Sequence, residues 1–218
     1  MNRITPSILA ADFLHLSENI QRLEKAGIEK IHLDIMDGNF VPNISFGPMI
    51  IEQIRKVTDL HLETHLMIFD PEKWIDRFVD AGSDAIIVHL EATNHPKNCL
   101  EKIGRLKIDK GISIKPNTHI DKIKAFLPML DIVLLMTVFP GFGGQAYLSD
   151  SNRRIEKLRK TIDGTPVDLA IDGGINTETI EQAIRAGANR CIAGSAVFRD
   201  GDIETNLITL KNLLDSAF

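Results

Sequence analysis

The sequence predicts a (β/α)8 barrel, in which eight parallel strands close into a cylinder and helices cover its outside. Short runs rich in Ile, Leu and Val alternate with amphipathic stretches along the whole chain, as parallel strands joined by helical crossovers do. Eight such units recur within 218 residues, which fits a compact barrel. A doubly wound open sheet is the alternative, but it requires a glycine fingerprint after the first strand, and Leu9–Asp12 contains no glycine.

The strand candidates are short and rich in aliphatic residues, as expected for strands buried on both faces of a parallel sheet. In chain order they are Arg3–Leu9, Lys30–Met36, His61–Met67, Asp84–Leu90, Gly111–Lys115, Asp131–Val138, Val167–Asp172 and Asn189–Gly194.

The segments between these strands carry helix signals. Glu18–Ala26 has its apolar residues on one face. Asp70 followed by Pro71 predicts a helix start with an Asp cap and Pro at the first helical position. Gly82 predicts the end of that helix.

Composition and charge limit the classes of function. Hydrophobic residues make up 44% and charged residues 25% of the chain, as in soluble globular proteins. The formal net charge of -5 argues against a general nucleic-acid binder but permits an anionic small molecule at a locally positive site. No apolar run approaches the roughly 20 residues that span a bilayer, so we expect no membrane partner and a cytoplasmic location. No linker divides the sequence, so we expect residues 1–218 to form a single catalytic domain.

Histidines and aspartates cluster at predicted strand ends. Because alternate side chains of a strand share a face, His32 and Asp34 point together. His65 lies near the end of the next strand and Asp172 ends the seventh. The carboxyl ends of barrel strands form the usual catalytic mouth. Two imidazoles and two carboxylates at that mouth are a ligand set suited to a borderline divalent metal ion.

Each of these residues also has a simpler interpretation. A single His or Asp at a strand end is more often a capping or hydrogen-bonding residue. Carboxylates crowded at one end of a barrel would repel one another and be costly to desolvate, and a shared cation removes that cost. Among the other histidines, His89 is expected to point into the barrel and contact the site. The remaining four, at element starts or in loops, are expected to be solvated: His15, His61, His95 and His119.

A second group of residues suits phosphate binding. The segment Pro140–Gln145 follows the sixth strand candidate and contains three glycines, and glycine pairs or Gly-Ser steps follow the seventh and eighth. Glycines let the backbone approach an anion and direct N–H donors toward it. Barrel phosphate sites commonly use the loops after strands seven and eight and a short helix. The predicted phosphate contacts are Gly141, Phe142, Gly143, Gly144, Gly173, Gly174, Gly194 and Ser195, with Ser195–Phe198 as the short helix.

The loop Pro140–Ala146 is long and rich in glycine, and we expect it to close over substrate as a lid.

Met36, Met67 and Met136 fall on the inward side of their strands near the same mouth. Core packing is the ordinary interpretation of each. As a trio they form a polarizable apolar wall that excludes water from a reactive carbanion.

A phosphate site beside a metal and two carboxylates predicts proton chemistry next to a carbonyl. A metal stabilises the charge of an enediolate, while one carboxylate removes a proton and the other returns one from the opposite face, which inverts a stereocentre. A single base would instead suit isomerisation, and a strand-end lysine would suit Schiff-base chemistry. Lys115 closes the fifth strand, but Pro116 after it indicates a turn, so we interpret Lys115 as structural or adjacent to substrate.

At these residues the sequence resembles the ribulose-phosphate 3-epimerase family, from Pro6 to about Phe198. The motifs that carry the resemblance are PSILAAD at Pro6–Asp12, HLDIMDGNFVPNISFGP at His32–Pro48, THLMI at Thr64–Ile68, PGFGGQ at Pro140–Gln145, DGG at Asp172–Gly174 and AGSAVF at Ala193–Phe198.

The resemblance implies an isomerase of the pentose phosphate pathway that interconverts D-ribulose 5-phosphate and D-xylulose 5-phosphate by two-base proton transfer at C3. It implies that Asp34 accepts the proton and Asp172 donates one. It implies that His32, Asp34, His65 and Asp172 bind one divalent ion, usually zinc or ferrous iron, with manganese and cobalt as further candidates. It also implies sugar contacts by Ser7 and His65.

Two other activities fit the same residues. D-Allulose-6-phosphate 3-epimerase would use the metal and paired aspartates on a six-carbon ketose phosphate. A metal-dependent barrel lyase of the hexulose-phosphate synthase type would cleave a carbon–carbon bond without inverting C3. For each activity the expected partner is a small phosphorylated ketose, and we expect a homo-oligomer because barrels commonly self-associate.

Overall fold

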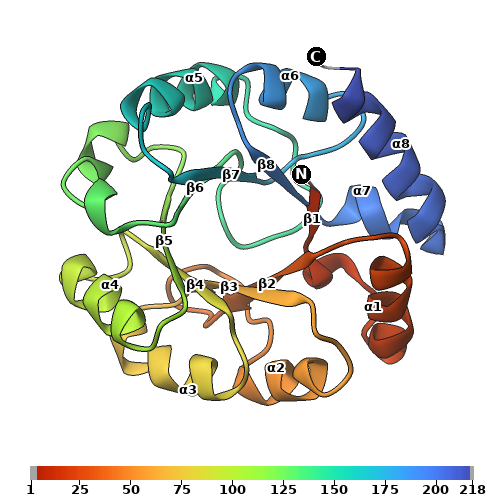
Figure 1. The fold of residues 1–218 in the computed structure, drawn as a ribbon, viewed down its shortest axis with the longest axis horizontal. Helices are drawn as coiled ribbons and strands as arrows, with labels where there is room; N and C mark the ends of the chain where they lie inside the picture. Colours follow the sequence, from red (N-terminus) through yellow and green to blue (C-terminus); the bar gives the residue numbers. More distant parts are fainter. Residues whose placement is uncertain (1–3, 217–218) are drawn as a thin grey trace.

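The structure, a computed structural model, describes residues 4–216, and within them eight parallel strands surround a common axis. Figure 1 looks down this axis and shows the strands at the centre and the helices outside them. The strands are β1 Ile4–Pro6, β2 Lys30–Met36, β3 His61–Met67, β4 Ala85–His89, β5 Asp109–Ile114, β6 Ile132–Met136, β7 Asp168–Asp172 and β8 Arg190–Ala193. The predicted (β/α)8 barrel is therefore confirmed.

Strand order explains how the ring closes. Neighbours in sequence are neighbours in the sheet from β2 to β8, and β1 pairs with β8 in parallel. The remaining gap, between β1 and β2, is bridged in parallel at Ser7 and His32. Closure thus brings the first strand next to the strand that carries two of the predicted metal ligands.

The outer layer consists of helices that follow the strands. They are α1 Leu16–Lys25, α2 Pro48–Arg55, α3 Ile75–Asp80, α4 Pro96–Arg105, α5 Ser151–Thr161, α6 Ile180–Arg185, α7 Ser195–Phe198 and α8 Ile203–Asp215. Between β5 and β6 the connection is made by 3-10 turns at Ile120–Ile123 and Leu127–Met129. The main apolar core lies between the helices and the outward faces of the strands, where Ile20, Leu23 and Ile31 are fully buried. None of the described helices is long and apolar enough to cross a membrane.

The inside of the barrel holds a smaller core. On β4, β6, β7 and β8 it is apolar, with Ile87, Leu134, Ala170 and Ile192 in contact. On β2 and β3 the inward residues are polar, because the register pairs His32 with Glu63 and Asp34 with His65. Aliphatic groups therefore fill much of the interior between β4 and β8, where the ionisable side chains His89, Asp172 and Arg190 lie only at the ends of their strands.

Strand bounds differ from the sequence predictions mainly at their ends. β2 and β3 have the predicted bounds, whereas the first strand stops at Pro6 and a 3-10 turn covers Ile8–Ala10. Arg3, the predicted first residue of that strand, lies outside the described residues. β5 begins two residues earlier than predicted, at Asp109. Each of the other four predicted strands extends one or two residues beyond the observed strand at one or both ends.

The predicted helix start at Asp70 is only partly right. Pro71–Lys73 forms a 3-10 turn, and the α-helix begins later, at Ile75. Asp70 has a left-handed backbone (φ 48°), and its carboxylate accepts from Lys73 Nζ at 2.7 Å instead of capping a helix N–H. The predicted end is correct, since Gly82 follows the helix with φ 108°.

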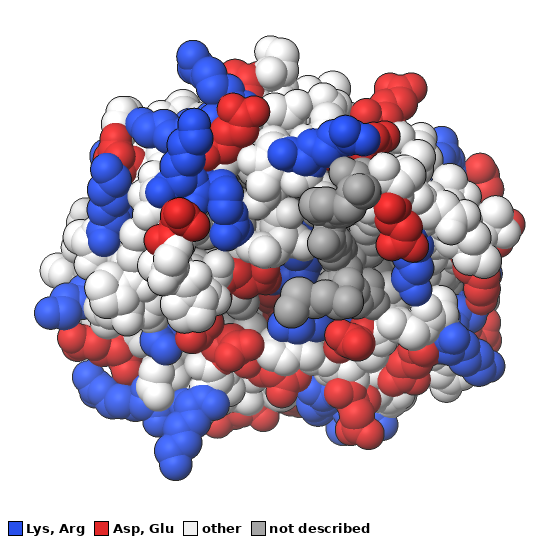
Figure 2. Space-filling model, turned by 45° about the horizontal axis from the view of Figure 1, so that its top comes forward, with Lys and Arg blue, Asp and Glu red and all other residues white. Residues whose placement is uncertain are grey.

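Charged side chains are distributed over the surface with both signs mixed. On the face in Figure 2, Lys and Arg are interspersed with Asp and Glu. A surface of this kind supplies no continuous basic area on that face for a nucleic-acid backbone.

The barrel interior leaves no room for an added methyl group at Gly111. A Cβ there would lie 2.8 Å from Ile87 Cγ1 and 3.2 Å from Ile132. We expect Gly111→Ala to lower the free energy of unfolding by about 1–3 kcal/mol, because overpacking forces neighbours off their positions. Gly104→Ala in α4 is the control, since its Cβ would meet only Lys110 at 3.6 Å. Urea denaturation of both variants checks this, and equal stabilities would contradict it.

Candidate active site

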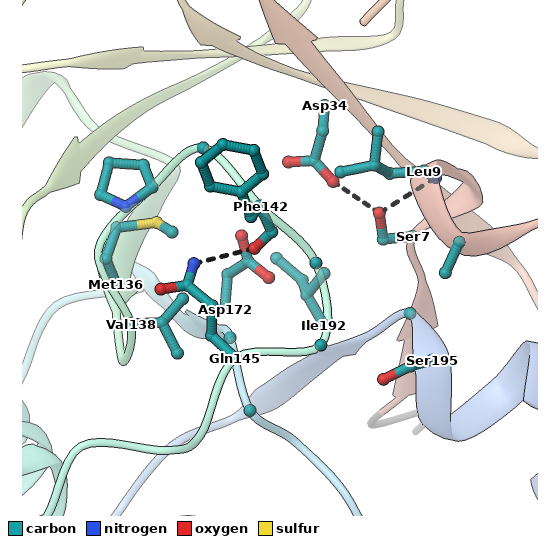
Figure 3. Close-up of a pocket in the computed structure, with 18 of the residues that line it drawn as sticks. Ser7, Leu9, Asp34, Met136, Val138, Phe142, Gln145, Asp172, Ile192 and Ser195 are labelled. Carbon is teal, nitrogen blue, oxygen red and sulfur yellow. Dashed lines mark hydrogen bonds between the residues drawn. The ribbon is translucent and has the colours of Figure 1, made fainter. Parts of the chain in front are cut away.

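A cavity of about 480 Å³ opens at the carboxyl ends of the strands. Its walls come from the ends of β1, β2, β3, β6, β7 and β8 and from the loops that follow them. Figure 3 shows the carboxylates of Asp34 and Asp172 within this cavity, with the ring of Phe142 beside them. The cavity therefore lies at the end of the barrel where the sequence placed the site.

Four of the predicted residues meet at the inner end of the cavity. One ligand atom from each of His32, Asp34, His65 and Asp172 lies within 4.8 Å of the others. Asp34 Oδ1 is 3.2 Å from His65 Nδ1 and 3.4 Å from His32 Nε2. Asp172 Oδ2 is 3.9 Å from His65 Nδ1. Residues from three strands thus converge on one point.

The donor set fits a divalent metal ion. Nε2 of His32 is buried and lacks a hydrogen-bond partner among the described residues. An unpaired nitrogen in a dry interior is costly. A cation would bind this lone pair together with Asp34, His65 and Asp172, and nitrogen and carboxylate ligands in this number suit zinc or ferrous iron.

The two carboxylates have opposite electrostatics. Burial by itself would raise the pKa of Asp34, but the neighbouring charge of His32 and the hydrogen bond with His65 hold it well below its ordinary value. Burial and the neighbouring charge of Asp34 raise the pKa of Asp172 to about 7. Near neutral pH, Asp34 is therefore ionised, whereas a proton is easily held by Asp172.

The two histidines also differ. Burial opposes a charge on His32, but Asp34 and Glu63 outweigh it and raise the pKa of His32 to about 10. Burial lowers the pKa of His65 to about 4, and its hydrogen bond to Asp34 offsets this only in part. His65 is thus neutral at physiological pH and ready to donate a lone pair.

Ser7 holds the other oxygen of Asp34. Its hydroxyl donates to Asp34 Oδ2 at 2.5 Å, and the Ser7 side chain lines the cavity. Figure 3 shows this bond beside the cavity. The hydrogen bond favours the charged form of Asp34 and fixes the plane of its carboxylate.

Behind the four residues stand further polar groups, of which sequence reasoning singled out His89 but not Glu63 or Glu91. Glu63 Oε1 lies 2.8 Å from His32 Nδ1. His65 Nε2 lies 2.9 Å from His89 Nε2, and His89 Nδ1 lies 3.2 Å from Glu91 Oε2. The prediction that His89 points into the barrel and contacts the site is confirmed. Strand period was the available signal for Glu63, which precedes His65 by two positions and therefore shares its face.

The remaining histidines lie away from the site. His15, His95 and His119 are exposed, as predicted. His61 is not fully solvated: it is half-buried at the start of β3, and its Nε2 lacks a hydrogen-bond partner. Burial lowers the pKa of His61, so it is neutral there.

The glycine loops line the same cavity as Asp34 and Asp172. Gly173 and Gly174 have φ of 113° and 68°, and a Cβ at Gly174 would lie 2.5 Å from the backbone nitrogen of Tyr147. Only glycine fits a backbone of this shape at so close an approach. Phosphate-binding loops require this kind of close packing, because the N–H groups themselves must reach the anion.

The loop Pro140–Ala146 is held by two side chains that sequence reasoning missed. Gln145 Nε2 donates to the carbonyls of Phe139 and Phe142 at 2.7 and 2.8 Å, and Asn43 Nδ2 donates to the carbonyl of Gly141 at 2.8 Å. In Figure 1 this loop follows β6 and is seen through the centre of the ring of strands, on the far side of the barrel. The loop is therefore attached to the β2 side of the mouth at Asn43.

Nearly all predicted site residues border the cavity. They are Ser7, Asp34, Met36, Met67, Met136, Gly141, Phe142, Gly143, Gly144, Asp172, Gly173, Gly174, Gly194 and Ser195. His32 and His65 do not line it, since both are fully buried in the metal cluster below. Pro140 and Gln145, the ends of the predicted phosphate segment, also line the cavity. The lining residues that were not predicted are Leu9, Ala10, Asn43, Val138, Ile175 and Ile192.

The fold and the site together define a class: a parallel (β/α)8 barrel with a His/Asp cluster for a divalent metal at the carboxyl ends of its strands. The model of the ribulose-phosphate 3 epimerase family matches residues 3–198. The chain therefore belongs to the ribulose-phosphate 3-epimerase family.

Individual relatives agree with this membership. A Bacillus subtilis protein named ribulose-phosphate 3-epimerase is 42% identical over 205 residues, which cover 93% of this chain and 94% of that protein. One of the same name from Synechocystis is 43% identical over 213 residues, covering 96% and 93%.

Solved structures of low sequence identity share the fold. A 3-keto-L-gulonate-6-phosphate decarboxylase from Vibrio cholerae superposes with a TM-score of 0.74 at 15% identity and full coverage of this chain (100%, and 99% of its own). A tryptophan synthase A-subunit from Pyrococcus furiosus gives 0.71 at 16% identity, covering 97% and 96%. At such identity these likenesses establish the barrel alone.

Zinc binding to the metal-free protein is expected to strengthen as pH rises from about 6 to about 8. The raised pKa values of Asp172, about 7, and His32, about 10, mean that protons must leave before the metal binds. Affinity should rise by up to about tenfold per pH unit for each proton released. Chelator competition at several pH values measures this, with Asp172→Asn as the variant that lacks one of the protons. An affinity independent of pH would contradict the expectation.

Proposed function

We propose that this chain interconverts D-ribulose 5-phosphate and D-xylulose 5-phosphate by moving a proton at C3. The observation that carries the proposal is the pair Asp34 and Asp172, which reach one cavity from β2 and β7 and favour opposite protonation states. Family membership and the names of the relatives support the substrate.

Asp34 acts as the base when the reaction starts from ribulose 5-phosphate. Its carboxylate takes the proton from C3, and the electrons of the C–H bond form an enediolate with the neighbouring carbonyl. Ser7 keeps Asp34 ionised and oriented through its hydrogen bond to Oδ2. Proton transfer from carbon requires this alignment, because the base must lie within hydrogen-bond reach of the proton that it removes.

Asp172 acts as the acid. Its raised pKa keeps a proton available near neutral pH, and it delivers that proton to the opposite face of C3. The carboxylic acid becomes a carboxylate as the enediolate becomes a ketone, so charge balances over the cycle. In the reverse direction the two aspartates exchange roles.

A bound divalent ion supplies Lewis-acid stabilisation of the negative charge that develops during this transfer. His32, Asp34, His65 and Asp172 would hold it. Zinc and ferrous iron are the first candidates and manganese and cobalt the next, since mixed nitrogen and oxygen sites accept several of these ions.

The substrate phosphate is bound by backbone groups of the glycine loops that line the cavity. These loops contain Gly141–Gly144, Gly173–Gly174 and Gly194–Ser195. Three loops converge there, and glycine lets their N–H groups approach an anion. Phe142 and its neighbours cover the substrate, and Ser7, which lines the cavity, is the proposed sugar-side contact. The resemblance also implied a sugar contact by His65, but this side chain is fully buried below the cavity, so we propose it as a metal ligand only.

Met36, Met67 and Met136 form the apolar part of the wall. All three are buried, with 2–5% of their surface exposed. They keep water away from the enediolate and strengthen the electrostatic interactions around it.

We further propose that residues 1–218 act as one catalytic domain, and that copies of the chain associate into a homo-oligomer.

Substrate preference is tested by assaying purified protein with ribulose 5-phosphate and with allulose 6-phosphate. We expect turnover of the five-carbon substrate to exceed that of the six-carbon one in kcat/KM. The reverse order would identify an allulose-6-phosphate 3-epimerase. Release or fixation of formaldehyde without inversion at C3 would indicate a lyase and contradict the proposal.

Removal of the acid should stop inversion at C3. We expect Asp172→Asn to reduce kcat by about 10²–10⁴-fold or more, because the amide delivers no proton and is a poorer metal ligand. Asp168→Asn is the matched control: the same change in the same strand at the other end of the barrel. Turnover in deuterium oxide, followed by NMR, should place deuterium at C3 in the wild type and in the control. Full activity of Asp172→Asn would refute the two-base mechanism.

A further inference from the structure

A buried ion pair lies inside the barrel below the metal cluster. Arg190, on β8, and Glu63, on β3, are 5% and 0% exposed. The guanidinium donates to both carboxylate oxygens, from Nη2 to Oε2 at 2.6 Å and from Nη1 to Oε1 at 3.1 Å. Arg190 is itself held by Thr5 Oγ1 at 3.0 Å and by Asp168 Oδ2 at 2.8 Å.

The same carboxylate contacts a proposed metal ligand. Glu63 Oε1 lies 2.8 Å from Nδ1 of His32. Because Glu63 is ionised by its pairing with Arg190, it accepts this bond, and the proton resides on Nδ1 of the imidazole. The lone pair of a neutral His32 is then on Nε2, the buried nitrogen that faces Asp34 at 3.4 Å without a hydrogen-bond partner.

Stability alone does not explain the pair. Two charges withdrawn from water gain little over apolar side chains of similar volume, and replacing such pairs by apolar residues is often neutral or stabilising. Apolar side chains occupy the interior positions paired with the two charged residues on the neighbouring strands, Ala85 beside Glu63 and Ala170 beside Arg190. The charged pair lies next to His32. Its place in the barrel is therefore better explained by contact with the His/Asp cluster than by stability.

We propose that Glu63, oriented by Arg190, is a positioning residue that fixes the tautomer and the ring plane of His32 so that Nε2 binds the divalent ion. This inference rests on the proposed function, since it assigns His32 to the metal. The bidentate contact with a planar guanidinium fixes the plane of the carboxylate and hence the direction of Oε1. A carboxylate behind a ligating histidine also makes the imidazole a stronger ligand.

The test uses paired substitutions that leave no unpaired charge in the interior. Glu63→Leu with Arg190→Met removes the acceptor behind His32 and keeps the volume. Glu63→Gln with Arg190→Met restores an acceptor, because the amide oxygen still receives the Nδ1 proton. Asp168→Asn is the control, since Asp168 contacts Arg190 but not Glu63 or His32.

Zinc dissociation constants are measured by chelator competition on folded, metal-free proteins. We expect the Leu/Met protein to bind zinc about 10–100-fold more weakly than the wild type, the Gln/Met protein to fall between them, and Asp168→Asn to match the wild type. Thermal unfolding in excess chelator is recorded in parallel. A purely structural role would change unfolding of the metal-free proteins without producing this order of zinc affinities.

The inference is overturned when the Leu/Met protein binds zinc as tightly as the wild type, or when the Gln/Met protein binds it no more tightly than the Leu/Met protein. Should the Leu/Met protein fail to fold, the Gln/Met protein decides: a loss of about threefold or more supports the role and an unchanged affinity refutes it. Failure of the wild type to bind zinc or to epimerise would instead refute the proposed function. An active, zinc-binding wild type with unaffected variants refutes this inference alone.

Discussion

Electrostatic crowding at the inner end of the cavity is the constraint on which the rest of the site depends. Ligand atoms of Asp34 and Asp172 lie within 4.8 Å of the same two histidines. Both carboxylates are largely buried, since no more than 15% of either side chain is exposed. Like charges in a medium of low dielectric repel strongly, so both cannot be ionised without a cation or a proton between them. The arrangement requires either a metal or a proton, and the proposed chemistry uses both.

The surrounding polar groups hold the two aspartates and two histidines of the cluster in one arrangement. Ser7 orients Asp34 from the side of β1. Glu63 and Arg190 stand below His32, and His89 with Glu91 stands behind His65. In a dry interior a satisfied polar network specifies one arrangement, whereas a partly satisfied one would be costly. Rigid strands supply the ionisable groups, and loops that only glycine can form supply the wall proposed for phosphate.

Predictions from the sequence were most accurate where the two-residue period of a strand coincided with burial on both faces. β2 and β3 have the predicted bounds, and the inward direction of His32, Asp34 and His65 followed from that period. The ends of the other strands were less predictable, because pairing with the neighbouring strand, and not residue type alone, decides where a strand begins and stops. The Asp70 cap failed because its carboxylate contacts Lys73 instead of the helix.

The sequence by itself determined the class of fold, the strand ends that carry chemistry and the glycine segments beside them, since these depend on local pattern. Only the tertiary structure decided which distant groups meet. Arg190 pairs with Glu63 across 127 positions of the chain, and Asp172 reaches His65 from the far side of the ring. Closure of the barrel between β1 and β2 determines which inward side chains come into contact, because the register of a closed sheet depends on all its strands at once.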